Sequence, residues 1–283
     1  MISATTISPL NRRIVDDGGG FDPIASAFIA AAGITGATQQ AACNILALAL
    51  RGSGTTNGTN FISGNLLYYF YSNTPIDDST FSLNSCKFNF LNPLDTDAAF
   101  RITWANDPIA TVNGVSQNGS VNAYGNTHFN ENNETVLGSV GYSWGLKNFV
   151  NVSNNDYAFG ASTSGDLLGP RYRETTNYIR YYHGNVYVQQ SFDAISRNSL
   201  NRVATNNLLL YRNGSYIANN INIVSQKANE SMYLLSRNSL GSPTSFTNAT
   251  IQYMVSHKGL NADQVKDLDD AIVLYLTALG TLW

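Results

Sequence analysis

Residues 208–217 read LLLYRNGSYI, an apolar run that meets an Asn-Gly pair and then resumes with alternating residues. Both central positions of a two-residue hairpin turn need a positive φ, so Asn213-Gly214 predicts a β-hairpin. Two further strand-like runs follow at 232–235 and 249–255, and an amphipathic segment at 261–280 closes the chain. This order of hairpin, strand, strand and helix predicts a β-sandwich.

The middle of the chain, residues 61–257, repeats the strand pattern throughout. Apolar or alternating runs separated by Gly- and Asn-containing turns predict strands at 66–71, 86–91, 99–104, 136–144 and 178–189, the last with a turn at 183–185. No helical pattern intervenes, which favours antiparallel pairing. The predicted fold class is mainly β.

The first 60 residues have a different pattern. Asp22 followed by Pro23 is typical of a helix start, and Gly33 is a suitable stop. A second helix is expected from Thr35 or Thr38 to Leu50. The GTTNGTN stretch at 54–60 is interpreted as a linker. We therefore expect a helical segment at 1–60 and a sandwich at 61–283.

The closing helix at 261–280 belongs to the predicted sandwich. Asn261 is a suitable N-cap and Gly280 a suitable stop. Its apolar residues form one stripe, as expected of a helix packed on a sheet: Val265, Leu268, Ile272, Leu276 and Leu279.

The composition excludes several classes of function. Charged residues make up only 12% of the 283 residues and the net charge is −3, so we expect no nucleic-acid partner. No apolar run approaches the roughly 18 residues of a membrane span, and no secretory signal peptide is expected. Cys43 and Cys86 are expected to be buried and unpaired.

The carboxylates and histidines form no recognisable catalytic pattern. The chain has four glutamates, and the closest pair, Glu131 and Glu134, is interpreted as an exposed hairpin tip. We therefore expect no enzyme activity, no cofactor and no transition-metal site. Asp95 and Asp97 are weak calcium candidates, although the same pattern is also a turn signal.

Aromatic side chains are the remaining candidates for ligand contact. Tyr124, Trp144, Tyr172, Tyr181 and Tyr182 could stack on sugar rings if they shared an exposed sheet face. The alternative, which we favour, is that alternating aromatics belong to the core or to cross-strand pairs.

The C-terminal third resembles the concanavalin A-like (laminin-G-like) jelly roll. The matching pieces are LYRNG at 210–214, YLLSR at 233–237 and ATIQYMVSHKGLN at 249–261. The resemblance implies an antiparallel β-sandwich (jelly roll) closed by a short C-terminal helix, and the predicted N-terminal helical segment precedes it. It covers residues 200–280 well and the earlier strands by pattern alone.

The chain is also similar to structural proteins of phages and prophages of Bacteroidetes. The similar stretches are AGITGATQQAA at 32–42, LALRG at 48–52, KFNFLNPLDTDAAFRI at 87–102 and GSVNAYGNT at 119–127, whereas 53–85 departs from the pattern. The resemblance implies a non-enzymatic virion protein assembled in the bacterial host cytoplasm, as a head-fibre, tail-fibre or decoration module. Residues 22–52 would attach it to other virion proteins or form a homo-oligomer, with a trimer favoured, and the jelly roll could bind host-surface glycan. The alternatives are a lectin-like receptor-binding module and a polysaccharide depolymerase.

Overall fold

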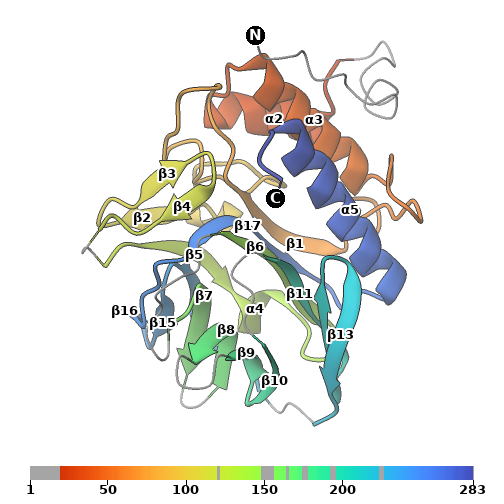
Figure 1. Cartoon of the computed structure of the whole chain (residues 1–283), viewed down its shortest axis with the longest axis vertical. Coiled ribbons are helices and arrows are strands. Elements are labelled where there is room, and N and C mark those ends of the chain that lie inside the picture. Colours follow the sequence, from red (N-terminus) through yellow and green to blue (C-terminus); the bar gives the residue numbers. More distant parts are fainter. Residues whose placement is uncertain are drawn as a thin grey trace.

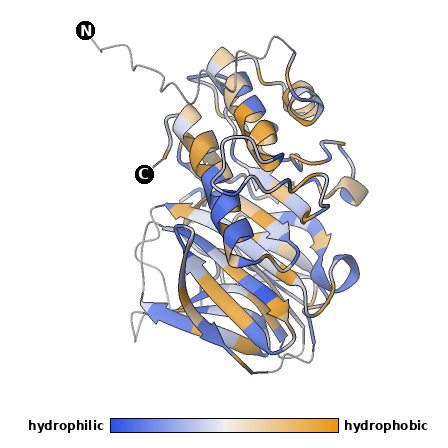
Figure 2. Ribbon diagram, turned by 90° about the vertical axis from the view of Figure 1, so that its right-hand side faces the viewer, coloured by the Kyte–Doolittle hydropathy of each residue, from blue (hydrophilic) through white to orange (hydrophobic). Residues whose placement is uncertain are grey.

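The computed structural model describes residues 20–119, 122–147, 156–163, 166–173, 178–191, 196–222 and 226–282. Two largely antiparallel sheets pack face to face, and three helices lie together at one end of the molecule, over the outer face of one sheet (Figures 1 and 2). The predicted fold class, a mainly β sandwich with N- and C-terminal helices, is confirmed.

The first sheet has eight strands. Its order is β13 (Ser215–Asn220), β12 (Asn207–Arg212), β11 (Ser196–Ala204), β6 (Val140–Lys147), β17 (Thr250–His257), β4 (Gly114–Ser116) and β3 (Ile109–Thr111), and β1 (Leu67–Ser72) also pairs with β17. Asn213 and Gly214 connect β12 to β13 with φ values of 50° and 73°, so the predicted hairpin turn is confirmed.

The second sheet has nine strands. Its order is β10 (Val186–Ser191), β9 (Tyr178–Gly184), β8 (Asp166–Arg173), β7 (Phe159–Thr163), β14 (Ser231–Leu234), β5 (Tyr124–Asn130) and β2 (Thr103–Ala105). The short strands β15 (Arg237–Ser239) and β16 (Ser242–Thr244) extend it through β7. β9 and β10 form the hairpin predicted at 178–189.

The core between the sheets is built from alternate residues of both. Trp144 of β6 packs against Phe159 of β7 and Tyr181 of β9, with ring centroids 5.3 and 5.7 Å away. Aromatic side chains bury a large apolar area, and the edge-on arrangement of Trp144 and Phe159 is favourable for their ring quadrupoles. These contacts hold the two sheets together.

A second apolar cluster lies between the eight-stranded sheet and the helices α2 (Pro23–Ala32), α3 (Ala37–Leu50) and α5 (Ala262–Ala278). Strand β1 has both faces buried: Phe70 belongs to the cluster under the helices, and Tyr69 and Tyr71 belong to the core between the sheets. This double burial explains why residues 66–71 read as one continuous apolar run.

Local capping signals place α2 and α5 as predicted, whereas α3 begins after Gly36 without a side-chain cap, so neither Thr35 nor Thr38 is its N-cap. The Asp22 carboxylate accepts the backbone N–H of Ile24 at 2.9 Å, and its other oxygen lies 2.5 Å from Nε of Arg51, just after α3. Asn261 and Gln264 form a reciprocal capping box at the start of α5. The stretch at 54–60 is tied to α5, because Asp267 accepts the backbone N–H groups of Asn57 and Thr59 at 2.7 and 2.8 Å.

Two predicted strands are wrong. Residues 86–91 form turns joined to β1 by a single β-bridge, because the Asn89 side chain itself accepts the backbone N–H groups of Phe70 and Leu91. Within 99–104 the 3-10 turn η1 (Asp97–Ala99) ends at Phe100, whose φ is 59°, so only β2 remains. The strand predicted at 136–144 starts later, at Val140, after a turn that joins Val136 to Ser139.

Other expectations concern single residues or whole helices. Cys43 and Cys86 are buried and unpaired, as predicted. Among the described residues, the helices are all too short or too polar to cross a membrane. Residues 1–19 and the side chain of Tyr172 lie outside the described part of the chain. The division at residue 60 stays a prediction.

Candidate functional site

A polar cleft of about 540 Å³ opens beside α4 (Glu131–Glu134). Three pieces of chain form its walls: α4 with the residues after it, the paired ends of β7 and β8 at Thr163 and Asp166, and the segment that precedes β14. The lining residues are Asn132, Leu137, Thr163, Asp166, Gln226, Lys227 and Asn229. Five of these seven carry uncharged side chains, and four of the five end in an amide or a hydroxyl.

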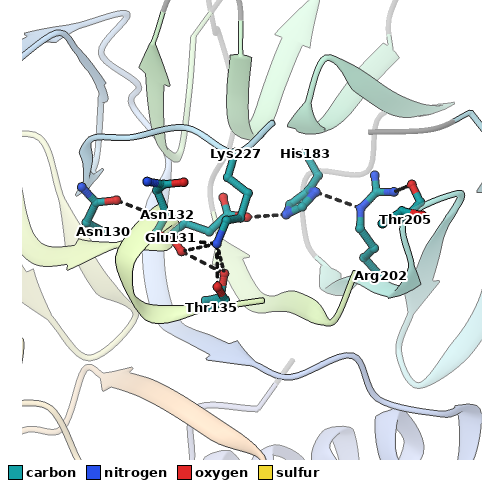
Figure 3. A network of polar contacts seen from close by, with 8 residues as sticks. All are labelled: Asn130, Glu131, Asn132, Thr135, His183, Arg202, Thr205 and Lys227. Atoms are coloured by element: carbon teal, nitrogen blue, oxygen red, sulfur yellow. Dashed lines mark hydrogen bonds and ion pairs between the residues drawn. The ribbon is translucent and has the colours of Figure 1, made fainter. Parts of the chain in front are cut away.

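A chain of buried polar groups runs behind this cleft and joins the two sheets (Figure 3). Nε2 of His183, on β9, lies 2.5 Å from Oε1 of Glu131, and Nε of Arg202, on β11, donates to Nδ1 of the same imidazole at 2.9 Å. The three residues are at most 1% exposed. Buried charges are stable in a protein only when they are paired and hydrogen-bonded. This row of hydrogen-bonded side chains therefore fixes α4 against both sheets.

The hydrogen bonds determine the tautomer of His183. A guanidinium has donors only, so Nδ1 of His183 must be the acceptor of the bond from Arg202. The ring proton then lies on Nε2 and is donated to Glu131. Arg202 also donates to the carbonyl oxygen of Thr205 at 2.7 Å. Burial lowers the pKa of Arg202 to about 10, and the negative charge of Glu131 opposes that shift.

Lys227 donates hydrogen bonds to the backbone of α4 and of the residue after it (Figure 3). Its ammonium donates to the carbonyl oxygens of Glu131, Asn132 and Thr135 at 3.1, 3.2 and 2.6 Å. An ammonium has three protons, and three carbonyl oxygens match that number. Lys227 therefore holds the backbone of α4 in place, and its donors are already used.

Asp166 is the carboxylate of the cleft wall. It is 8% exposed, and the described residues offer it neither a hydrogen bond nor an ion pair. Burial raises the pKa of Asp166, and the nearby charge of Glu131 raises it further. A nearly buried, unpartnered carboxylate facing a cleft is the arrangement expected where a ligand supplies the missing partner.

A second groove, of about 320 Å³, lies at the β2 edge of the nine-stranded sheet and includes Trp104, Lys87 and Arg101. Both cations already have partners: Lys87 contacts Asp95 at 2.7 Å, and Arg101 contacts Asp95 and Asp97, each at 2.9 Å. Both cations of this groove are therefore engaged by carboxylates.

The predicted aromatic residues do not form one exposed face. Trp144 and Tyr181 are each 1% exposed and lie in the core between the sheets, so neither offers a ring face to solvent. Tyr124 is half-buried on β5 and stacks on Tyr233 at 4.9 Å. Tyr172 lies on β8, and its side chain is outside the described part.

Asp95 and Asp97 are engaged by cationic side chains rather than grouped as metal ligands. Lys87, then Arg101, lowers the pKa of Asp95. Among the described residues, groups of three or more His, Cys, Asp or Glu side chains suited to a metal ion are absent.

Sequence reasoning missed the central residue of this region. Glu131, interpreted as part of an exposed hairpin tip, is 1% exposed and paired with His183. The correction has a topological reason, because its partner lies 52 residues further along the chain and reaches it only through the folded sheets. The one local signal is Asn130, whose side chain caps α4 by accepting the N–H of Asn132.

Comparisons with known proteins place the fold. No protein-family model and no curated protein matches the chain. A mutant of Trypanosoma rangeli sialidase displaying trans-sialidase activity has a TM-score of 0.54 at 15% identity, over 84% of this chain and 38% of that one. Trypanosoma rangeli sialidase in complex with sialic acid has a TM-score of 0.51 at 16% identity, over 75% and 34%. Botulinum neurotoxin type C, whose cell entry depends on two ganglioside molecules, has a TM-score of 0.48 at 12% identity, over 76% and 51%.

At these identities the sialidase similarity establishes a shared β fold, and the chain spans only 34–38% of the length of those sialidases. It also corrects the prediction that the chain is not an enzyme. Enzymes contain this fold, so the architecture gives no ground for excluding catalysis.

Proposed function

We propose that the chain is a glycan-binding β-sandwich protein whose binding site is the cleft beside α4. The observation that carries the proposal is the lining of this cleft: amide and hydroxyl groups from Asn132, Thr163, Gln226 and Asn229, together with the unpartnered carboxylate of Asp166. The sialidase-like fold supports it.

The lining suits the chemistry of a sugar. Each sugar hydroxyl is both a donor and an acceptor, and a side-chain amide offers both functions on one planar group. The volume of about 540 Å³ lies within the range of about 300–1,000 Å³ that is usual for ligand sites. The buried Glu131–His183–Arg202 chain keeps α4 rigid, so little ordering is needed on binding.

A glycan array probed with the wild-type protein and two variants tests the proposal. Asn229→Ala removes a cleft amide, and Asn84→Ala removes an amide from the groove near Trp104. The wild type and Asn84→Ala should bind the same glycans, and Asn229→Ala should bind them about five- to thirtyfold more weakly, since one lost polar contact costs about 1–2 kcal/mol. Equal binding by all three proteins would place the site elsewhere, and no binding by any would remove the proposal.

Cleavage of the bound glycan is a second candidate, favoured by Asp166. Glycosidases commonly pair two carboxyl groups, one of which has a raised pKa and donates a proton. Asp166 lies close enough to Glu131 for that charge to raise its pKa. Release of a reducing sugar by the wild type, and its loss in Asp166→Asn at glycan concentrations that saturate this variant, would support cleavage. Binding without any product would reject it.

We also propose that the outer face of α2 mediates self-association, the role expected of residues 22–52 in a virion fibre or decoration protein. An apolar groove of about 630 Å³ supports this, since its lining includes exposed Ala27 and Ala30 together with Leu94, which is 60% exposed. Light scattering should give an oligomeric mass for the wild type and a monomeric mass for Ala27→Glu. A monomeric wild type would contradict this proposal.

A further inference from the structure

We infer that the cleft selects neutral glycans over acidic ones such as sialylated sugars, with Asp166 as the residue that sets this preference. The inference rests on the proposed glycan site and names the class of sugar that the site takes. Its basis is the set of charged groups that line the cleft and lie directly behind it.

The first observation is that the cleft has a free acceptor. Asp166 is 8% exposed and has no hydrogen-bond or ion-pair partner among the described residues. An unpartnered carboxylate accepts hydroxyl protons on its two oxygens, and two adjacent hydroxyls of a neutral sugar match that number. A bound sugar would supply the hydrogen-bond donors that Asp166 lacks among the described residues.

The second observation is that the cleft cation is already occupied. Lys227 is the one Lys or Arg among the described lining residues, and its ammonium donates to the three carbonyl oxygens of Glu131, Asn132 and Thr135. Turning it toward a ligand would leave those carbonyls unpaired, which is costly for partly buried groups. A ligand carboxylate would therefore find no ready cation.

The third observation is the charge behind the wall. The Glu131 carboxylate lies close enough to raise the pKa of Asp166, after the larger effect of burial, whereas the Arg202 cation is bonded to the other ring nitrogen of His183 and is not among the groups that shift Asp166. A sialic acid carboxylate in the cleft would then face Asp166, with a second carboxylate behind it. Like charges brought together at an interface oppose binding strongly.

This preference differs from that of a structural neighbour, which was solved with sialic acid bound. The two chains share a fold at 16% identity, and a shared fold does not fix the ligand. The contacts of Asp166 and Lys227 are local features of this chain and carry the inference by themselves.

The test is an array of neutral oligosaccharides, each printed beside its sialylated counterpart, followed by affinity measurements on the best pair. The wild type should bind the neutral member at least about tenfold more tightly. Asp166→Asn keeps the shape and removes the charge, so it should weaken the neutral ligand and bring the two affinities within about threefold. Asp95→Asn, at an ion pair outside the cleft lining, should leave the ratio unchanged.

A second measurement needs no variant. Raising the salt concentration screens charge repulsion, so the preference of the wild type should shrink with ionic strength. Equal or tighter binding of the sialylated member by the wild type would overturn the inference and leave glycan binding intact. A preference that neither salt nor Asp166→Asn reduces would also overturn it. Failure to bind either member would remove the proposed function and this inference with it.

Discussion

At the scale of single residues, the strongest energetic feature is the buried chain Glu131–His183–Arg202. Glu131 and Arg202 are buried opposite charges joined through the neutral ring of His183, and removing one such charge leaves the other uncompensated, which typically costs about 3–5 kcal/mol. Arg202→Ala should therefore lower the free energy of unfolding by about that amount in urea titrations. Arg101→Ala, which breaks two exposed ion pairs, is the matched control and should change little. Similar stability of the two variants would show that the buried Glu131–His183–Arg202 contacts contribute little to the free energy of unfolding.

His257 should make the free energy of unfolding fall as the pH falls. Burial lowers its pKa from 6.5 to about 4, and a hydrogen bond to the Lys258 carbonyl opposes the shift. Above pH 6.5 the imidazole is neutral in the folded and unfolded states alike. Below it the unfolded chain takes up a proton first, so about 3 kcal/mol of stability should be lost as the pH falls from 6.5 to about 4. Urea titrations across this range should show a shallower loss for His257→Gln than for the wild type, and parallel profiles would contradict the assignment.

Single residues were predictable where the signal is local. Asp22, Asn213 and Asn261 act on neighbours within a few positions, and each has its predicted role. Glu131 was misread because its environment depends on a strand 52 residues away. The candidate cleft depends on three separated pieces of chain, so no window of sequence contains it.

At the scale of elements, α5 holds the stretch at 54–60 in place through Asp267. This carboxylate is fully buried and accepts three hydrogen bonds from Asn57 and Thr59, two of them from backbone N–H groups. Asp267→Ala should cost about 2–3 kcal/mol of unfolding free energy, because it leaves those donors unpaired. Asp270 lies three residues later on α5 and accepts hydrogen bonds from Thr56 that are more exposed. Asp270→Ala should therefore cost clearly less unfolding free energy. Equal costs would show that burial of the acceptor does not matter here.

Elements with long apolar patterns or strong turn pairs were predicted correctly, and short polar ones were not. The β12–β13 and β9–β10 hairpins and α5 follow from periodicity and turn chemistry. Residues 86–91 alternate like a strand, yet the Asn89 side chain takes the place of a ladder partner. Side-chain competition of this kind has no periodic signature.

At the scale of the whole molecule, the three long helices and the eight-stranded sheet share one apolar cluster. Phe28 of α2 contacts Phe90 at 4.9 Å, and Phe70 of β1 contacts the same ring at 5.8 Å. The helices should therefore unfold together with the sandwich. Urea curves followed by far-ultraviolet circular dichroism and by tryptophan fluorescence should coincide, since Trp104 and Trp144 lie in the sandwich. An earlier loss of helix signal would show that the N-terminal helices unfold separately.

The central claim is that the cleft beside α4 binds glycan, and an NMR titration of isotope-labelled protein with the best glycan from the array tests it most directly. Saturable shifts of the amides of Asn132, Thr163, Gln226 and Asn229 are predicted, with the residues around Trp104 unchanged. Shifts confined to the groove near Trp104, or none at millimolar glycan, would contradict the account.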